Sequence, residues 1–351
     1  MNSVRWEIPR INPIIVREVR TRMRGGRPYV ILTGFLIALI LVGIGIYFLM
    51  LQQQRNGGTV LSPQLGQALF YGMSLSQLLL IVFLAPAMTS GSISSEHEQL
   101  TYEMLIATPL RAGQLLWGKL ISALLYLFLL VFTSLPLFSV VLIFGGVQPL
   151  ALIKVVILLV LATITAGSIG LFCSALFKRT ARATIMSYVL ILLMIGGTSI
   201  FASLWTQFNP NSMGNPAPPP VLYLNPFSAL TSITTTAPRT DGTIVIGDNN
   251  PLQWIPFLNA LGPSPMYYGN QGPVVVPIYR ASYLIYSGLT ILLLWISAHL
   301  VQPRRRWMPQ VSDIGFMLAW FGWLGVMWLT ANWWYIIVTI DGPFGFGGVR
   351  M

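Results

Sequence analysis

Seven long runs of apolar residues constrain the fold of this 351-residue chain more than any other feature of its sequence. A helix needs about 20 apolar residues to cross the hydrocarbon core of a bilayer, and each run reaches or approaches that length. The runs are residues 29–51, 66–90, 115–144, 150–177, 183–204, 283–301 and 314–340. Charged residues make up 8% of the chain, which is too few to cover a water-soluble globule. The sequence therefore predicts an all-α integral membrane protein, in which a six-helix bundle is followed by a seventh, Trp-rich helix.

Lys and Arg residues are distributed unevenly among the segments that connect these runs. They concentrate before the first run and after the second, fourth and sixth runs, whereas the alternate segments have few. Because cytoplasmic loops carry an excess of Lys and Arg, the N-terminus and the 91–114 loop are predicted to be cytoplasmic. The net charge of +11 is assigned to this orientation and to contact with membrane lipids, and nucleic acid is not expected as a partner.

The loop after the second run contains a segment that is typical of a short helix. Ser95 and Glu98 have the spacing of a capping box, in which the glutamate reaches back to the capping residue. The helix is predicted to end near Ala107, because Thr108 precedes Pro109 and is pushed out of helical geometry. The acidic face would consist of Glu96, Gln99 and Glu103. We interpret this amphipathic helix as a docking element for a cytoplasmic protein rather than as a simple connection.

The next residues, from Gly113 to Leu120, differ from a phosphate-binding loop at one position. Leu120 has no hydroxyl group for magnesium, and no strand is predicted before the segment, so ATP is not expected to bind here. Lys119 is interpreted as a cation that extends to the cytoplasmic surface. The chain has one cysteine and two histidines that are far apart in sequence, so no metal site and no catalytic cluster is expected. The sequence thus predicts that the chain is not an enzyme and holds no cofactor of its own.

An interfacial helix is predicted in the N-terminal segment, residues 1–28. Apolar side chains fall on one stripe of this helix and arginines on the opposite side, which is typical of a helix that lies among lipid headgroups. Glu18, in the arginine-rich part of this helix, is expected to pair with a neighbouring arginine such as Arg22. The residues that define this elbow are Ile11, Pro13, Arg17, Glu18 and Arg20.

The chain is expected to have one transmembrane domain, residues 29–302. This domain would include the cytoplasmic helix at about 95–108 and an external loop at about 206–280. The loop is rich in Pro, Gly and Asn, with short helices expected at 227–236 and 253–261. Residues 303–351 would form a basic cytoplasmic linker and the seventh helix.

Three short patterns resemble those of the membrane subunits, or permeases, of ABC transporters of the ABC-2 type. The first is Asn12-Pro13 with Arg17-Glu18 before the first run, and the third is Leu224-Asn225-Pro226-Phe227 in the large loop. The second is the most specific and combines Glu96, Glu98, Thr101, Glu103 and Leu105 with Ala107-Thr108-Pro109-Leu110 and Gly118-Lys119. Together with the spacing of the first six runs, the resemblance covers roughly residues 10–302. The seventh run departs from the usual six spans of that family.

The resemblance implies a half-transporter that works as a dimer with itself or with a homologous permease. A coupling helix would contact a separate ABC ATP-binding subunit, in which ATP and magnesium would bind, and the first, second and fifth spans would line the path. The coupling residues would be Glu96, Glu98, Thr101, Glu103, Leu105, Thr108 and Pro109. We expect an exporter in the plasma membrane of a prokaryotic cell. The alternative is a non-transporting anchor that recruits a cytoplasmic protein through the same helix, and a membrane enzyme is the least supported interpretation.

Overall fold

The computed structural model describes residues 26–55, 62–100, 112–208, 219–235, 266–269, 272–275, 277–301, 311–334 and 338–339. The long helices are α2 (Arg27–Arg55), α3 (Ser62–Thr89), α6 (Ala112–Thr133), α8 (Pro149–Leu176), α13 (Ile278–Val301) and α14 (Val311–Trp334). The shorter helices are α4 (Ser94–Glu98), α7 (Leu135–Ile143), α9 (Thr180–Leu192), α10 (Thr198–Phe208) and α11 (Pro226–Thr235). A π-helical turn (Leu193–Gly197) joins α9 to α10, and a 3₁₀ helix (Pro220–Leu224) precedes α11.

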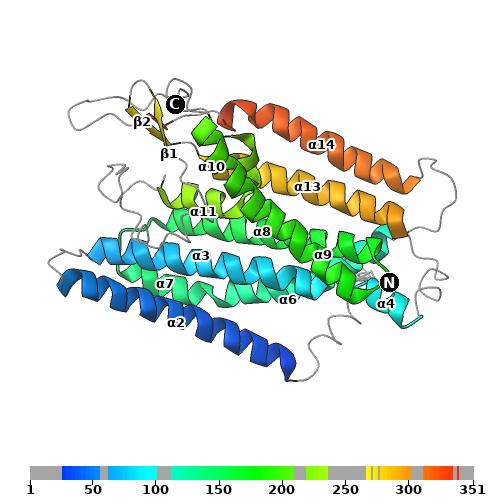
Figure 1. Cartoon of the computed structure of the whole chain (residues 1–351), viewed down its shortest axis with the longest axis horizontal. Coiled ribbons are helices and arrows are strands. Elements are labelled where there is room, and N and C mark those ends of the chain that lie inside the picture. Colours follow the sequence, from blue (N-terminus) through cyan, green and yellow to red (C-terminus); the bar gives the residue numbers. More distant parts are fainter. Residues whose placement is uncertain are drawn as a thin grey trace, which may run out of the picture.

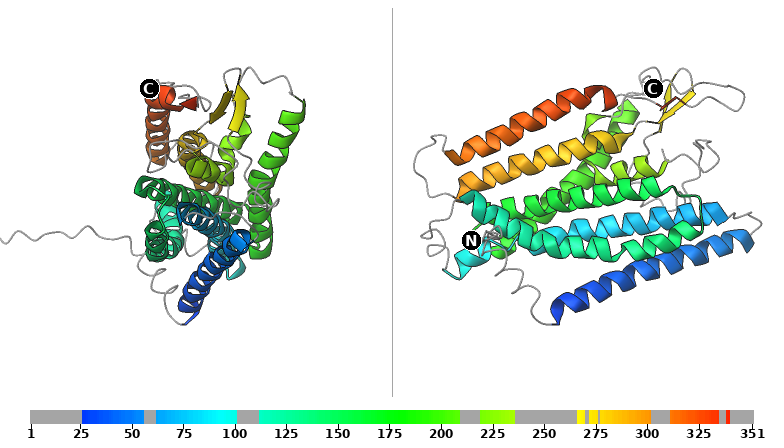
Figure 2. Two further views of the ribbon diagram at one scale, coloured as in Figure 1. Left: turned by 90° about the vertical axis from the view of Figure 1, so that its left-hand side faces the viewer. Right: turned by 180° about the vertical axis from the view of Figure 1, so that it is seen from behind.

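The long helices lie side by side in one bundle, with α2 and α14 at opposite margins (Figures 1 and 2). Six helical stretches among the described residues are long and apolar enough to cross a membrane. They match the first six predicted runs in order, so the predicted all-α membrane bundle is confirmed. We call the end where α3 leads into α4 the α4 end, and the opposite end, where a small sheet lies, the sheet end (Figure 1).

Helix α8 is the central helix of the bundle, and it contacts α3, α6, α9, α11 and α13. Its second half is rich in small residues, which allow neighbouring backbones to come close in a membrane. A Cβ atom on Gly170 would lie 2.0 Å from Oγ1 of Thr89 and 3.1 Å from Cα of Pro86, both on α3. The close contact between α3 and α8 therefore depends on the absence of a side chain at this position.

The third span is broken, which the apolar run did not predict. Helix α6 ends at Thr133 and α7 begins at Leu135, with Pro136 in the first turn of α7. Proline has no N–H group and interrupts the helical hydrogen bonds. At the break, the Ser134 hydroxyl donates to the carbonyl oxygen of Val131 at 2.7 Å and accepts a bond from Nε2 of Gln77 on α3, also at 2.7 Å.

Helix α14 confirms the predicted seventh helix and packs along α13. The Trp323 ring lies over Gly288, where a Cβ atom would be 2.4 Å from the ring, and its Nε1–H donates to the carbonyl oxygen of Leu284 at 2.9 Å. The sixth span begins at Ile278, five residues earlier than its apolar run, and Ser282 in this added part is buried and donates to the carbonyl oxygen of Tyr223 at 2.9 Å. Much of α14 is otherwise exposed on the margin of the bundle.

A three-stranded antiparallel sheet lies beside the bundle, which the sequence analysis did not predict. Its order is β1 (Met266–Gly269), β2 (Gly272–Val275) and β3 (Val338–Thr339). Strand β2 precedes α13 and pairs with β3, which follows α14. The two helices therefore run antiparallel, and the end of α14 returns to the sheet end of the bundle.

Helix α11 confirms one of the two short helices expected in the large loop, and the other, at 253–261, lies outside the described residues. It contacts α3, α8 and α13, and residues 227–233 are all buried. The main-chain N–H of Tyr279 in α13 donates to Oγ of Ser232 at 3.0 Å. The loop thus places a helix inside the bundle rather than on its surface.

Candidate functional site

The turn that leads from α3 into α4 is built by serine hydroxyl groups. Oγ of Ser92 donates to the carbonyl oxygen of Thr89 at 2.7 Å, and Oγ of Ser94 donates to that of Ser90 at 3.0 Å. Such bonds from serine to nearby carbonyls compete with a continuous helix and favour turns. The chain therefore leaves α3 after Thr89, and α4 begins with Ser94 buried.

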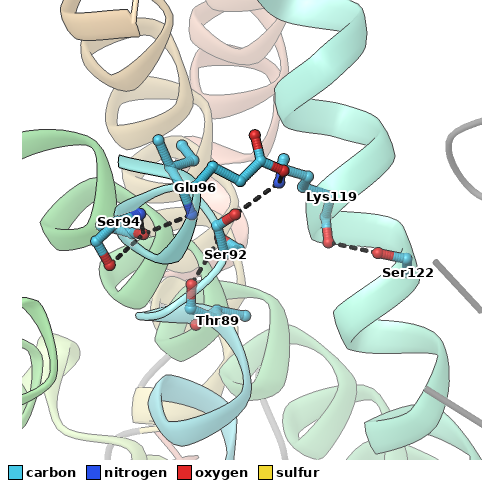
Figure 3. A network of polar contacts seen from close by, with 8 residues as sticks. Thr89, Ser92, Ser94, Glu96, Lys119 and Ser122 are labelled. Carbon is cyan, nitrogen blue, oxygen red and sulfur yellow. Dashed lines mark hydrogen bonds and ion pairs between the residues drawn. The ribbon is translucent and has the colours of Figure 1, made fainter. Parts of the chain in front are cut away.

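Lys119 of α6 holds this turn from inside the protein (Figure 3). Its Nζ atom lies 2.5 Å from Oε1 of Glu96 and donates to the carbonyl oxygen of Ser92 at 2.6 Å. The exposed fraction of the side chain is 3% for Lys119 and 21% for Glu96. The interpretation of Lys119 as a cation that reaches the surface was therefore wrong, because the carboxylate and the carbonyl supply its partners in the interior.

Ser174 of α8 binds the same turn from a second side. Its Oγ accepts hydrogen bonds from the main-chain N–H groups of Ile93 at 2.8 Å and Ser94 at 3.0 Å. These two N–H groups belong to the first turn of α4, where a helix leaves its donors unpaired. Ser174 is fully buried and satisfies them in place of a cap from α4 itself.

Glu98 connects α4 to α9, which forms the first half of the fifth span. Its Oε1 accepts a bond from the main-chain N–H of Thr180 at 2.9 Å, and its Oε2 accepts one from the Thr180 hydroxyl at 3.0 Å. Thr180 is the first residue of α9, so the carboxylate caps that helix and complements the positive end of its dipole.

Two parts of the helix prediction for this loop were wrong. The residue before α4 is Ile93, no side-chain cap is present, and Glu98 binds α9 instead of forming a capping box with Ser95. The helix also ends at Glu98 rather than continuing through Leu100, whose φ of 58° is left-handed and incompatible with an α-helix. Leu100 is 85% exposed.

The structure brings together two of the predicted coupling residues, Glu96 and Glu98, and directs both carboxylates toward other parts of the chain. The other coupling residues, Thr101, Glu103, Leu105, Thr108 and Pro109, lie outside the described residues. The same holds for the elbow residues Ile11, Pro13, Arg17, Glu18 and Arg20. Sequence reasoning missed Ser174 and Thr180, which complete the arrangement, because nothing in a local pattern indicates a partner about 80 residues away.

The segment that is similar to a phosphate-binding loop has a different structure. Residues 113–120 lie within helix α6, which begins at Ala112, and the Lys119 ammonium is bound by Glu96 and Ser92. A phosphate-binding loop instead presents main-chain N–H groups and a lysine to the phosphates. Among the described residues, no group of three His, Cys, Asp or Glu side chains could hold a metal ion.

Replacing Glu98 by alanine tests the contact between α4 and α9. We expect the change to remove the cap of α9 and to lower the free energy of unfolding by about 1 kcal/mol, as loss of a helix cap usually does. Amide hydrogen exchange should accelerate in the first turn of α9 and remain unchanged in α8. Glu98→Gln keeps one acceptor oxygen, so its exchange rate in this turn should lie between those of the unaltered protein and Glu98→Ala. Equal exchange rates in all three proteins would contradict the cap.

Comparisons with known proteins agree with a bundle of membrane helices. The model of the ABC-2 family transporter proteins matches residues 13–307 of this chain. The chain is similar to the uncharacterized membrane protein YdbK of Bacillus subtilis (strain 168), with 28% identity over 190 residues. That alignment covers 49% of this chain and 75% of YdbK. No solved structure matches the chain.

Proposed function

The chain belongs to the ABC-2 family of transporter proteins, and from this premise we propose that it is the permease subunit of an ATP-driven exporter. As a member of that family with six apolar helical stretches, it is a multi-pass membrane component of a transporter. In the proposed complex it forms the translocation path as a dimer, with itself or with a homologous permease. A separate ATP-binding subunit binds ATP and magnesium and hydrolyses the nucleotide.

One observation carries this proposal: a single short turn is tied to three spans at once. Residues 92–98 bind α6 through Lys119, α8 through Ser174 and α9 through Glu98. A partner that displaces this turn would therefore move several membrane helices together. A turn that only connected two spans would not need contacts with three of them.

The polar contacts also favour the α4 end as the side that faces the ATP-binding subunit. Three exposed cations, Lys178, Arg179 and Arg182, lie at the start of α9 beside Glu98. Their position supports a cytoplasmic location for this end and contact with anionic lipids. At the sheet end, two cations instead lie against an aromatic ring: the ammonium of Lys154 is 5.1 Å from the centre of the Tyr279 ring, and Arg280 also contacts that ring. We therefore place the N-terminus in the cytoplasm and the protein in the plasma membrane of a prokaryotic cell.

Purification from native membranes in a mild detergent tests the proposal. We expect an ATP-binding protein with a phosphate-binding loop to co-purify and to hydrolyse ATP. Charge reversal at Glu103, in the predicted coupling segment, should release it without unfolding the permease, because the introduced positive charge would repel the basic surface that an acidic docking residue is expected to meet. Arg239→Glu, a charge reversal in the other large loop, is the matched control and should leave the complex intact.

The alternative function, an anchor for a cytoplasmic protein, gives a different result in the same experiment. An anchor would retain a cytoplasmic partner that does not hydrolyse ATP. Isolation of the chain with such a partner, and with no ATP-binding subunit even after cross-linking, would contradict the permease proposal.

A further inference from the structure

The fifth span changes its helical form near its middle. Helix α9 ends at Leu192, five residues form a π-helical turn, and α10 begins at Thr198. A π-helical turn shifts the hydrogen-bond pattern from i→i+4 to i→i+5 and often marks a functional position in a helix. Two of its residues, Gly196 and Gly197, are glycines, which lower the resistance of the backbone to such a change.

A main-chain carbonyl in this turn is bound by side chains. The carbonyl oxygen of Ile195 accepts bonds from the hydroxyls of Thr198 and Ser199, both at 2.9 Å. It also accepts a bond from Nδ2 of Asn225 at 3.3 Å. Asn225 is fully buried and comes from the large loop that follows the span.

Asn225 has two separate roles because its amide group binds on both sides. Nδ2 donates to Oγ of Ser199 at 2.8 Å as well as to Ile195, which ties it to the fifth span. Oδ1 accepts a bond from the main-chain N–H of Phe227 at 2.9 Å, so Asn225 also caps α11, where Pro226 is the first residue. One side chain thus joins the π-helical turn to a helix that is buried among α3, α8 and α13.

The two halves of the span belong to different hydrophobic clusters. Ile191 and Ile195, on the α9 side, are part of the main core, whereas Ala202 of α10 packs with Leu222 and Ile278 in a separate small cluster. Helix α9 contacts α3, α4 and α8, and α10 contacts the 3₁₀ helix that precedes α11. The outer side of the junction is not covered by other parts of the described chain, since Leu192, Leu193 and Ile200 are exposed.

We propose that the π-helical turn Leu193–Gly197 is a hinge in the fifth span and that Asn225 is the positioning residue that fixes its angle. The amide of Asn225 holds the turn in one arrangement by binding Ile195 and Ser199, and its release lets α9 and α10 change their relative direction. The hinge itself needs no partner protein, because all of the residues that form it belong to this chain. Its use in transport rests on the proposed function, in which α9, tied to Glu98 at one end, passes movement to the sheet end only while Asn225 holds the turn.

Spin-label distance measurements on the purified full-length chain test the hinge without an ATP-binding partner. Labels are attached at Ile185 on α9 and Leu204 on α10, both exposed, in a chain that also carries Cys173→Ala. The positions are 19 residues apart, so a straight helix would separate them by about 29 Å at about 1.5 Å per residue. The labelled protein that keeps Asn225 should give one narrow distribution of label-to-label distances.

Asn225→Ser separates the two roles of the asparagine. Serine still caps α11 but is too short to reach Ser199, so we expect the distance distribution to broaden or to split into two distances while the protein remains folded. Ser199→Ala removes one partner of the amide and should cause a smaller change of the same kind. Ser203→Ala, which removes a hydroxyl that bonds within α10, is the matched control and should leave the distribution unchanged.

An unchanged, narrow distribution in both Asn225→Ser and Ser199→Ala would overturn the proposal, as would equal broadening in Ser203→Ala. If Asn225→Ser does not fold, the Ser199→Ala result decides alone. Because no nucleotide or partner enters this measurement, failure of the hinge would leave the permease proposal standing. Conversely, failure to find any ATP-binding partner in native membranes would contradict the permease proposal and leave the hinge intact.

Discussion

Replacing Lys119 by methionine is expected to lower the free energy of unfolding by about 3 kcal/mol, because the change leaves the Glu96 carboxylate and the Ser92 carbonyl without their shared donor. Loss of one partner from a buried ion pair typically costs about 3–5 kcal/mol, and the partial exposure of Glu96 favours the lower end of that range. Unfolding in detergent, followed by circular dichroism, measures the difference. The same variant should increase amide exchange in α4.

Two further variants show whether this effect belongs to the ion pair. Lys119→Met combined with Glu96→Leu should recover most of the lost stability, since two well-packed apolar groups often replace a buried ion pair without cost. Lys178→Met removes an exposed cation nearby and should change stability by no more than about 0.5 kcal/mol. Equal losses for Lys119→Met and Lys178→Met would show that the buried pair does not hold the turn.

Gly170→Ala should destabilise the bundle by about 1–3 kcal/mol, because the added methyl group would overlap Thr89 and force α3 away from α8. Thr89 is not free to rotate without loss, since its hydroxyl donates to the carbonyl oxygen of Ala85 at 3.0 Å. The thermal unfolding midpoint and the yield of folded protein should both fall. Gly325→Ala on α14 is the matched control, because a Cβ atom there meets nothing within 4 Å. A Gly170→Ala protein as stable as this control would contradict the close packing of α3 on α8.

The positions of the membrane helices could be predicted because the signal for them is local. Each apolar run carries enough hydrophobic surface to require a lipid or protein environment by itself. The predicted seventh helix at 314–340 is found as α14, Val311–Trp334, but its predicted end was wrong, because Val338–Thr339 forms strand β3. The break at Pro136 was also visible in the sequence, but its effect was overlooked because the surrounding residues remain apolar.

The contacts between spans could not be predicted, because they depend on how one helix lies against another. Ser174 looks like an ordinary small polar residue of a membrane helix, whose side chain often bonds within its own helix. Asn225 belongs to the third family-like pattern, but that pattern does not indicate the partners of its side chain. Glu98 fitted a local capping pattern, yet the structure gives its carboxylate to α9. Local spacing could not reveal that the first turn of a distant helix competes for the same oxygens.

Several predictions from the sequence stay predictions. The domain boundaries, the N-terminal elbow and the coupling role of residues 101–109 rest on charge and apolar patterns and on family resemblance. The described part of the loop is consistent with the proposed docking role, because Leu100 is exposed in a turn that is anchored to three spans.

Photo-cross-linking from Leu100 in native membranes tests the central claim most directly. A photoreactive phenylalanine derivative replaces Leu100, and in a matched control protein it replaces Ile143, which is 83% exposed at the opposite end of the bundle. If the α4 end docks an ATP-binding subunit, light should attach a protein with a phosphate-binding loop at Leu100 and not at Ile143. A folded protein that forms no such product at Leu100, or forms it equally at Ile143, would contradict the claim.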